Sequence, residues 1–447
     1  MAKESKTGYR FAGDIDIKQS LLISVTGQII DIEKLIVEYN FYQSLHEHYM
    51  QCDLVIQDAV GLIDSLKGDS KNKLIGGFTG GEMFIIKFAV PGGKDIILSF
   101  ALYELTDRSR VDEKIESYML SGISVESYFS SVKKISRSYG PNKISAMVKS
   151  IVDEFVFSKE VKGLYNSYKG VTNSRLNKEV FVRDTSGLQK YIIPNMTVGE
   201  TIELLSKEAN NTKNIPFYRF YEDTVGFKFE DVNELIKQDF VKRFTYIPTI
   251  GNEVDNDQED QYKDASKIIE YTVQKQSNIL NNSQKGLFRS KTINLDILRK
   301  TKTETTFDYE KRHSDFNTLQ KFKIPGSIDG DPVLYMMQSR TNHDQDSLFT
   351  TERPYPKKIN QSVGLTQSYK SHIFNNVVDV VIPGDENLIV GNTIYLEIPV
   401  ATTLNKKDGQ QDKYLSGKYL ITKIRHQMKE EQFFSYLECV KDTGIEI

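Results

Sequence analysis

VVDVVIPGDENLIVGNTIYLEIP, residues 377–399, decides the fold class of this chain, because short apolar runs in it alternate with polar, glycine and proline residues. Two further runs follow a polar loop: YLSGKYLITKIRHQM at 414–428 and FFSYLECVKD at 433–442. Runs of this kind are typical of β-strands bounded by turns. The segments therefore predict four strands, at residues 377–382, 393–398, 417–428 and 433–441.

The last two of these strands form a predicted long hairpin. In its first strand Tyr419 and Ile421 share one face, and Leu420 and Ile424 share the other. Both faces are thus partly apolar, which suits a barrel that also packs against neighbours.

The amino-terminal third repeats this strand-rich pattern. Short β-branched and aromatic runs recur between residues 15 and 90, and glycine pairs and Pro91-Gly92-Gly93 separate them. Regularly spaced strands with Gly/Pro turns predict an antiparallel barrel, here at residues 9–132.

The period changes to that of a helix from about Pro141. One face of residues 144–155 is apolar at helical spacing. Thr197 and Glu200 form a capping-box pattern that opens a second helix, and residues 217–229 read as a hairpin. These elements predict an α/β middle domain at residues 133–250.

The remainder is assigned to a second barrel and an insertion. Residues 251–260 are rich in acids, but they lack the glycine and glutamate that a calcium loop needs, and a solvated linker is favoured. A strand at 268–275, a helix at 278–286 with a glycine cap and a hairpin at 287–309 follow. Residues 313–367 hold four prolines and little period. The predicted fold class is α+β, mainly β, with two similar antiparallel β-barrel (tube) domains; the second comprises residues 251–311 and 366–447, and 312–365 form an irregular insertion.

Composition limits the classes of function. The chain has 447 residues, 39% hydrophobic and 27% charged, which excludes disorder along its whole length. Its net charge of −3 argues against nucleic acid as the principal ligand. Cys52 and Cys439 are too few for a disulfide framework or a zinc cluster, and we expect buried thiols in a reduced compartment. No run suits a signal peptide or a membrane helix, so a soluble chain made in the cytoplasm is expected.

Candidate chemistry is sparse. His46 and His48 would share one face of a strand and could hold a metal, but a third ligand is missing and an exposed polar turn is favoured. His426 is expected to be a structural histidine at a strand edge or subunit contact. The glycine-rich stretch 76–81 lacks the ending of a phosphate loop, and nucleophile and dinucleotide motifs are absent. The acids at 329, 331, 344 and 346 pair only as often as chance allows in a chain with 61 acids. No catalytic, cofactor-binding or metal-ligating residue is therefore predicted.

The carboxyl-terminal motifs resemble those of a known family. They include Pro383-Gly384-Asp385, Leu388, Val390-Gly391, Ile394, Leu415-Ser416-Gly417, Tyr419-Leu420-Ile421, His426 and Lys441-Asp442. Interior matches lie at residues 197–200, 215–222, 226–229, 284–286 and 307–309. In this order the motifs resemble the baseplate hub proteins of contractile-tailed bacteriophages, the T-even phage hub among them. They are also similar to the hub part of type VI secretion spike proteins, and the likeness covers residues 11–442.

The resemblance implies a structural protein without enzymatic activity. Hub proteins of this family form a homotrimeric ring that adapts the six-fold tail tube to the three-fold central spike and surrounds a channel. The implied partners are a central spike protein, the first tail-tube ring protein, the tape-measure protein and passing DNA, without membrane insertion. The implied location is the virion tail baseplate, assembled in the host cytoplasm. Two alternatives stay open: a tail-associated peptidoglycan hydrolase, and the hub of a type VI-like injection system.

Overall fold

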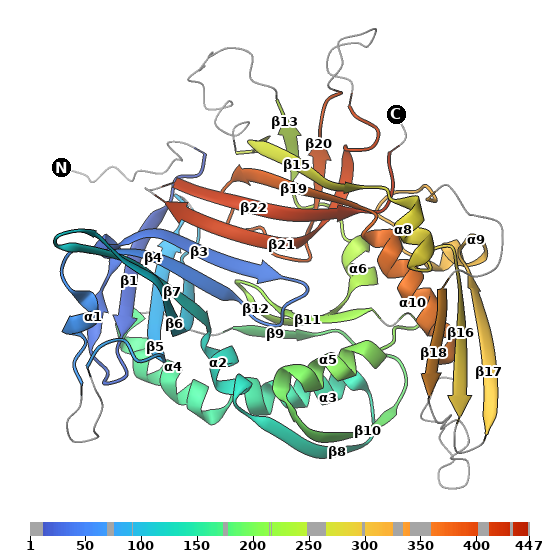
Figure 1. Cartoon of the computed structure of the whole chain (residues 1–447), viewed down its shortest axis with the longest axis horizontal. Coiled ribbons are helices and arrows are strands. Elements are labelled where there is room, and N and C mark those ends of the chain that lie inside the picture. Colours follow the sequence, from blue (N-terminus) through green and yellow to red (C-terminus); the bar gives the residue numbers. More distant parts are fainter. Residues whose placement is uncertain are drawn as a thin grey trace.

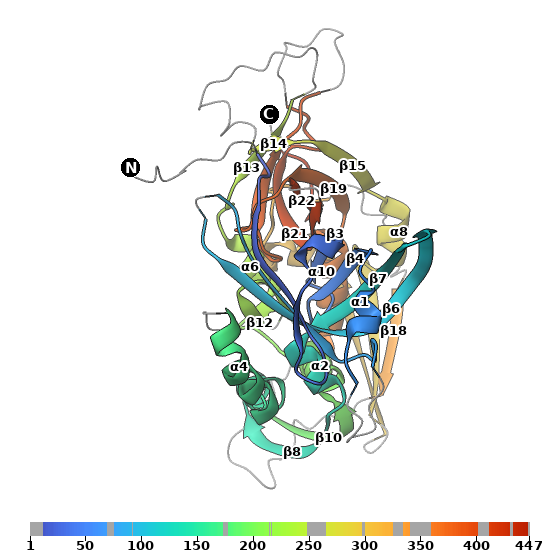
Figure 2. The same ribbon diagram turned by 90° about the vertical axis from the view of Figure 1, so that its left-hand side faces the viewer.

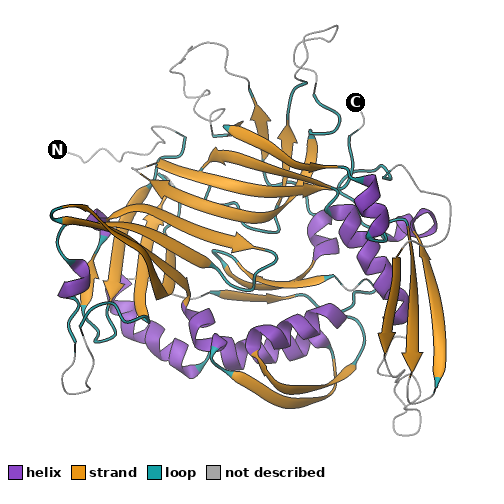
Figure 3. Cartoon of the chain, in the orientation of Figure 1, coloured by secondary structure: helices purple, strands orange, loops and turns teal. Residues whose placement is uncertain are grey.

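Strands dominate the structure, and its helices gather mainly in two groups, one below the large sheet and one at the end near β16, β17 and β18 (Figure 3). The computed structural model describes residues 12–68, 76–91, 93–172, 178–213, 215, 217–247, 265–296, 300–324, 334–339, 359–400, 411–429 and 432–445. The predicted class, α+β and mainly β, is confirmed. Among the described residues, no helix is long and apolar enough to cross a membrane.

The strands of the first β-block pair in one continuous succession. Neighbouring strands are antiparallel throughout, in the order β3-β4-β7-β6-β5-β1-β2. The chain passes from β2 into β3 through the short helix η1 (Glu33–Leu35), so the succession of pairings returns to its start. The strands are β1 (Asp16–Ile23), β2 (Ile29–Asp31), β3 (Ile36–Ser44), β4 (Gln51–Asp58), β5 (Glu82–Ala89), β6 (Ile96–Asp112) and β7 (Ile115–Ser124), with helix α1 (Leu62–Ser65) between β4 and β5.

The strands of the second β-block also pair in one succession. Its order is β15-β19-β22-β21-β20-β13-β14, and β14 leads directly into β15. We count β2 with β3 as one strand, and β14 with β15 as one strand, and we number the six strands of each block in the order in which the chain forms them. The spatial order of the strands is then 2-3-6-5-4-1 in both blocks. One direction differs: β13 is parallel to both neighbours, whereas β1 is antiparallel to both of its own. The strands are β13 (Arg243–Tyr246), β14 (Lys267–Ile268), β15 (Glu270–Gln276), β19 (Asn376–Pro383), β20 (Thr393–Glu397), β21 (Gly417–Lys429) and β22 (Gln432–Lys441).

The middle region packs helices on two small sheets, one of β8 and β10 and one of β11, β12 and β9. Figures 1 and 2 both place β8 and β10 on the side of the molecule opposite β13. The predicted capping box is confirmed, because Glu200 N donates to Thr197 Oγ1 and Thr197 N donates to Glu200 Oε2. The elements are α2 (Val125–Ser131), β8 (Lys134–Asn142), α3 (Ile144–Ile151), the π-helix η2 (Val152–Val156), α4 (Lys159–Thr172), β9 (Glu179–Val182), β10 (Gln189–Thr197), α5 (Val198–Glu208), β11 (Tyr218–Glu222), β12 (Gly226–Asp231) and α6 (Val232–Lys237).

A third region differs from the predicted boundaries. The hairpin of β16 and β17 was assigned to the second barrel, but it forms a separate sheet with β18 from the predicted insertion. Helix α10 covers this sheet at Gly364, where a Cβ would lie 2.8 Å from Phe307 Cβ and from Ser290 Oγ. The elements are α8 (Ile279–Gln284), β16 (Arg289–Asp296), β17 (Thr301–Asp308), α9 (Tyr309–Arg312), η3 (His313–Asp315), β18 (Leu334–Ser339) and α10 (Ile359–Ile373).

Two further boundaries also differ. Strand β13 lies within the predicted middle domain, yet it pairs with β20 of the second β-block. The irregular stretch 313–367 contains β18 and the start of α10. The local sequence gives little indication of β13 or α10, because β13 has only four residues and the apolar stripe of α10 is weak.

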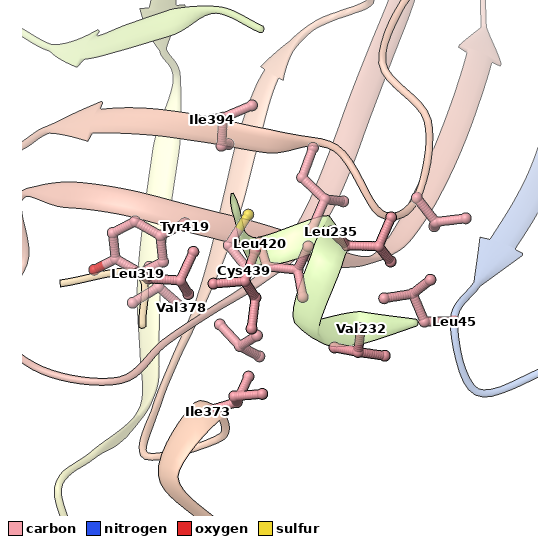
Figure 4. Packing of buried hydrophobic residues seen from close by; sticks show 14 of the residues in the cluster. Leu45, Val232, Leu235, Leu319, Ile373, Val378, Ile394, Tyr419, Leu420 and Cys439 are labelled. Atoms are coloured by element: carbon pink, nitrogen blue, oxygen red, sulfur yellow. The ribbon is translucent and has the colours of Figure 1, made fainter. Parts of the chain in front are cut away.

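The core of the second β-block draws on the whole chain. Figure 4 shows Leu45 from the turn after β3, Leu235 from α6 and Ile373 from α10 around Leu420 of β21. All four side chains are buried. The β-blocks and the helices around them therefore share apolar surface.

Candidate functional site

Strand β21 carries the strand ladder that joins the two β-blocks. Its first part pairs with β20 of its own block, and its second part, from Lys423 to Lys429, pairs with β3 of the first block. Seven residue pairs, antiparallel throughout, make this junction. A continuous sheet therefore passes from one block into the other.

Side chains reinforce the junction around Glu38. Arg425 Nη2 lies 3.2 Å from Glu38 Oε1, and Gln427 Nε2 donates to the same oxygen at 2.6 Å. Arg425 Nε also donates to Asn40 Oδ1 at 2.8 Å. Burial acts to raise the pKa of Glu38, but the hydrogen bonds from Asn40 and Gln427 and the charge of Arg425 lower it overall. The carboxylate thus stays charged at the block boundary.

The tip of the β21–β22 hairpin completes the first block. Met428 and Phe433 are buried in the core of that block. Phe433 N donates to Gly13 O, and an isolated bridge links Gln432 to Asp14. A Cβ at Gly384 would lie 2.0 Å from the Phe433 ring, so only glycine fits there. The Pro-Gly-Asp motif thus makes room for the hairpin tip.

A second long hairpin, β6–β7, extends from the first block, and residues 103–117 at its end are called the arm. Strand β5 covers the outer edge of β6 only as far as Leu102. Beyond that point, this edge of β6 has no strand partner among the described residues. Tyr103 is 47% exposed and Val111 is 60% exposed. The arm therefore presents an open strand edge with apolar side chains.

A buried charge cluster, formed by Glu126, Lys178 and Glu222, ties the first block to the middle region. Lys178 Nζ lies 2.8 Å from Glu126 Oε2 and also contacts Glu222 Oε1. The other Glu222 oxygen accepts from Met50 N at 3.0 Å and from Ser124 Oγ at 2.6 Å. Both carboxylates are fully buried. Helix α2, the start of β9 and the end of β11 thus meet the first block at one point.

Burial and charge act against each other in this cluster. Burial raises the pKa of Glu222, while Lys178 acts to lower it. Burial acts to lower the pKa of Lys178, but the two carboxylates raise it overall. The lysine is therefore positively charged, and the cluster depends on it.

Asp442 organises a second polar cluster after β22. Its carboxylate accepts from Leu319 N at 2.7 Å and from Gln320 N at 3.1 Å. Its carbonyl accepts from the side chains of Asn375 and Asn376. The Lys-Asp motif thus joins three segments that are distant in the sequence.

His46 and His48 lie in the turn between β3 and β4, as predicted, but only His46 is exposed and His48 is half-buried. The His46 ring lies 5.5 Å from the Phe374 ring, and the His48 ring lies 6.0 Å from the Phe220 ring. No group of three His, Cys, Asp or Glu side chains suited to a metal occurs among the described residues. The turn is therefore a contact point between the first block, the middle region and the end of α10.

His426 is buried within the β21–β22 hairpin rather than placed at a subunit contact within reach of solvent. Its Nδ1 lies 3.0 Å from Ser435 Oγ on the paired strand. Burial lowers the pKa of His426 from 6.5 to about 4. The predicted structural role fits this environment.

We expect His426 to make the stability of the protein depend on pH. A histidine whose folded pKa is depressed stays neutral in the folded state while the unfolded chain takes up a proton below 6.5. Stability is therefore full above pH 6.5 and falls by about 3 kcal/mol as the pH drops to about 4. Denaturant unfolding at several pH values should show this component in the wild type and not in His426→Gln. Parallel pH profiles for the two proteins would contradict it.

The remaining sequence candidates do not form a site in the described part of the chain. Gly77, Gly80 and Gly81 have positive φ in the connection to β5, as expected of a turn. Cys52 and Cys439 are free and buried. The linker 251–260 and the acids at 329, 331, 344 and 346 lie outside the described residues.

The middle region contains a cavity of about 470 Å³ near Asp231. Lys143 pairs with Asp184 at 2.8 Å and Lys237 with Glu234 at 2.6 Å on its walls. Burial raises the pKa of Asp231 to about 6. The charges that line the cavity are thus largely paired with one another.

Sequence reasoning missed the buried charge cluster. Its three members lie 96 residues apart at the extremes, and each looks like an ordinary charge next to a helix or strand. Glu222 ends β11 beside the turn of the predicted hairpin, and its side chain is buried. No local pattern could have revealed the contact.

Comparisons with known proteins give a consistent picture. No protein-family model matches the chain. The chain is 22% identical over 267 residues to the probable baseplate hub protein gp334 of Vibrio phage KVP40, over 57% of this chain and 58% of that one. The match thus spans little more than half the length of this relative.

Two solved structures share the fold. One is the tail protein from Neisseria meningitidis MC58, with a TM-score of 0.52 and 7% identity over 97% of both chains. The other is the 43 kDa tail protein of prophage MuSo2 from Shewanella oneidensis, with a TM-score of 0.52 and 12% identity over 95% of this chain and 98% of that one. The predicted resemblance to phage baseplate hub proteins is therefore confirmed, in sequence by a baseplate hub protein and in fold by tail proteins.

Proposed function

We propose that this chain is the structural hub of a phage tail baseplate and acts as a homotrimeric ring without catalysis. The observation that carries the proposal is the matching strand order of the two β-blocks, 2-3-6-5-4-1 in each. The blocks are copies of one barrel, one built from residues 12–124 and the other from residues 243–276 and 376–441. A single chain then supplies two similar units side by side.

Three such chains present six similar units around one axis. A closed ring of this kind can seat a six-fold tube on one face and a three-fold spike on the other. The partners are the first tail-tube ring protein, the central spike protein and the tape-measure protein, with DNA passing through the channel. The ring belongs to the baseplate of the virion tail and assembles in the host cytoplasm. The resemblance to baseplate hub proteins supports these assignments.

The first test is the mass of the assembly. Light scattering of the purified protein at micromolar concentration should give three times the mass of one chain, because cyclic symmetry closes heterologous contacts. Class averages of the particles should show a three-fold ring with six similar lobes. A monomer at every concentration, or lysis of cell wall on a zymogram, would contradict the proposal.

A further inference from the structure

We propose that the arm of one copy pairs with the open edge of β15 in a second copy and so joins neighbouring protomers. The inference rests on the proposed ring and names the strands that close it. It follows from how this chain joins its own two blocks.

The fifth strand of the second block shows the pattern. That strand is β21; it leaves its neighbour β20 at about Ile421 and then pairs with β3, the second strand of the other block. The ladder between β21 and β22 shifts by one residue between Ile421 and Lys423, where the strand leaves its own block. Such a bulge bends a strand and re-aims it.

The fifth strand of the first block has the same features without the partner. That strand is β6; it leaves β5 at Leu102, and its ladder with β7 shifts between Leu102 and Glu104. Residues 103–112 then run on with an outer edge that no described strand covers. The bend is therefore present where a neighbouring block is expected.

The matching acceptor is also open. The counterpart of β3, as second strand of the second block, is β15. One edge of β15 pairs with β19, and its other edge has no strand partner in the part of the chain that the structure describes. An uncovered edge is a template for a strand from another chain. Among the described residues, an unpaired donor strand and an unpaired acceptor edge thus occupy corresponding positions in the two blocks.

The tips of the two hairpins correspond as well. Met428 is the last residue but one of β21 and lies buried in the core of the neighbouring block. Val111 is the last residue but one of β6 and is 60% exposed. Ile115 follows at the start of β7. The apolar side chain near the tip of the β21–β22 hairpin is thus buried in a core, whereas the one near the tip of the β6–β7 hairpin is exposed.

Charge supports the antiparallel direction that β21 and β3 use. In that direction Glu104 lies toward the end of β15 that carries Lys275, and Arg110 lies toward Glu270. A parallel arrangement would place Glu104 beside Glu270. Like charges opposite one another are unfavourable in a sheet.

Disulfide trapping tests the contact. Cys52 and Cys439 are fully buried, so introduced thiols are the reactive ones. Arg108→Cys on the arm and Thr272→Cys on β15 should cross-link when the two variants are mixed under mild oxidation, and Arg108→Cys with Gln274→Cys covers the neighbouring register. Each variant alone should stay uncross-linked, because the contact joins two different surfaces. Cross-linking of an arm variant with itself would overturn the inference.

A tip substitution gives a second readout. Val111→Asp places a charge where an apolar core is expected, and it should raise the concentration at which the assembly dissociates by at least about tenfold. Val60→Asp is the matched control, because Val60 is 72% exposed on the same block but outside the arm. If Val111→Asp forms a trimer as readily as the wild type, and the cysteine variants give no mixed cross-link, the proposed strand pairing is wrong while the trimeric ring remains supported. If the wild-type protein is monomeric at every concentration, both the strand pairing and the trimeric ring are wrong.

Discussion

Replacing Lys178 by methionine is expected to lower the free energy of unfolding by about 3–5 kcal/mol. The substitution leaves Glu126 and Glu222 buried beside each other without a positive charge. Neither carboxylate can reach water, since both are fully buried. Equilibrium unfolding in urea, followed by circular dichroism, measures the loss.

Two control variants accompany the Lys178→Met experiment. Lys143→Met removes an exposed ion pair with Asp184 and should leave the unfolding midpoint unchanged. The triple variant with Lys178→Met, Glu126→Gln and Glu222→Gln should recover most of the loss, because it removes the uncompensated charges together. If Lys178→Met unfolds at the wild-type midpoint, the cluster does not hold the regions together.

The loss in Lys178→Met should also depend on pH. Burial raises the pKa of Glu222 above its ordinary value of 4.5 and the charge of Lys178 acts to lower it, so Lys178→Met should raise this pKa further. An acid with a raised folded pKa costs stability above 4.5, and the cost disappears as the pH falls toward that value. The difference between Lys178→Met and the wild type should therefore narrow from pH 7 toward pH 4.5.

Replacing Phe433 by alanine is expected to cost about 3–5 kcal/mol. The ring is buried in the first block, although Phe433 belongs to a strand of the second. Its loss leaves a cavity next to Gly384 and loosens the hairpin tip that the first block needs. The first block should then unfold at a lower denaturant concentration than the rest, giving two transitions.

The control for this substitution is Phe322→Ala. Phe322 is 43% exposed, so its removal should change stability little. A single transition for Phe433→Ala at the wild-type midpoint would mean that the hairpin tip contributes little to the first block.

Much of the fold could be predicted where local patterns are strong. The helix from Ile144 has a periodic apolar face and forms as expected. The capping box at Thr197 and the glycine that follows α8 are specific helix caps, and both are present. The apolar faces of the carboxyl-terminal hairpin were also informative. Tyr419 and Leu420 are both buried, and both belong to the core of the second β-block.

The rest depends on contacts between distant residues. A four-residue strand such as β13 has little pattern of its own, and its partners lie far along the chain. Likewise, the local sequence of the β16–β17 hairpin does not indicate that it pairs with β18 instead of with the large sheet. The buried charges of Lys178 and its partners follow from packing, which a linear sequence does not reveal.

The shared hairpin has a consequence for how the protein is made. Gln427 and Glu38, which are hydrogen bonded, are 389 positions apart, so the first block leaves the ribosome long before the strand that completes it. Contacts of such high sequence separation form late and slow the search for the native state. During synthesis the β3 edge stays open, and it is exposed to chaperones or to other nascent chains. Only a chain translated through the hairpin supplies the strand that pairs with β3 and the tip that packs into the first block.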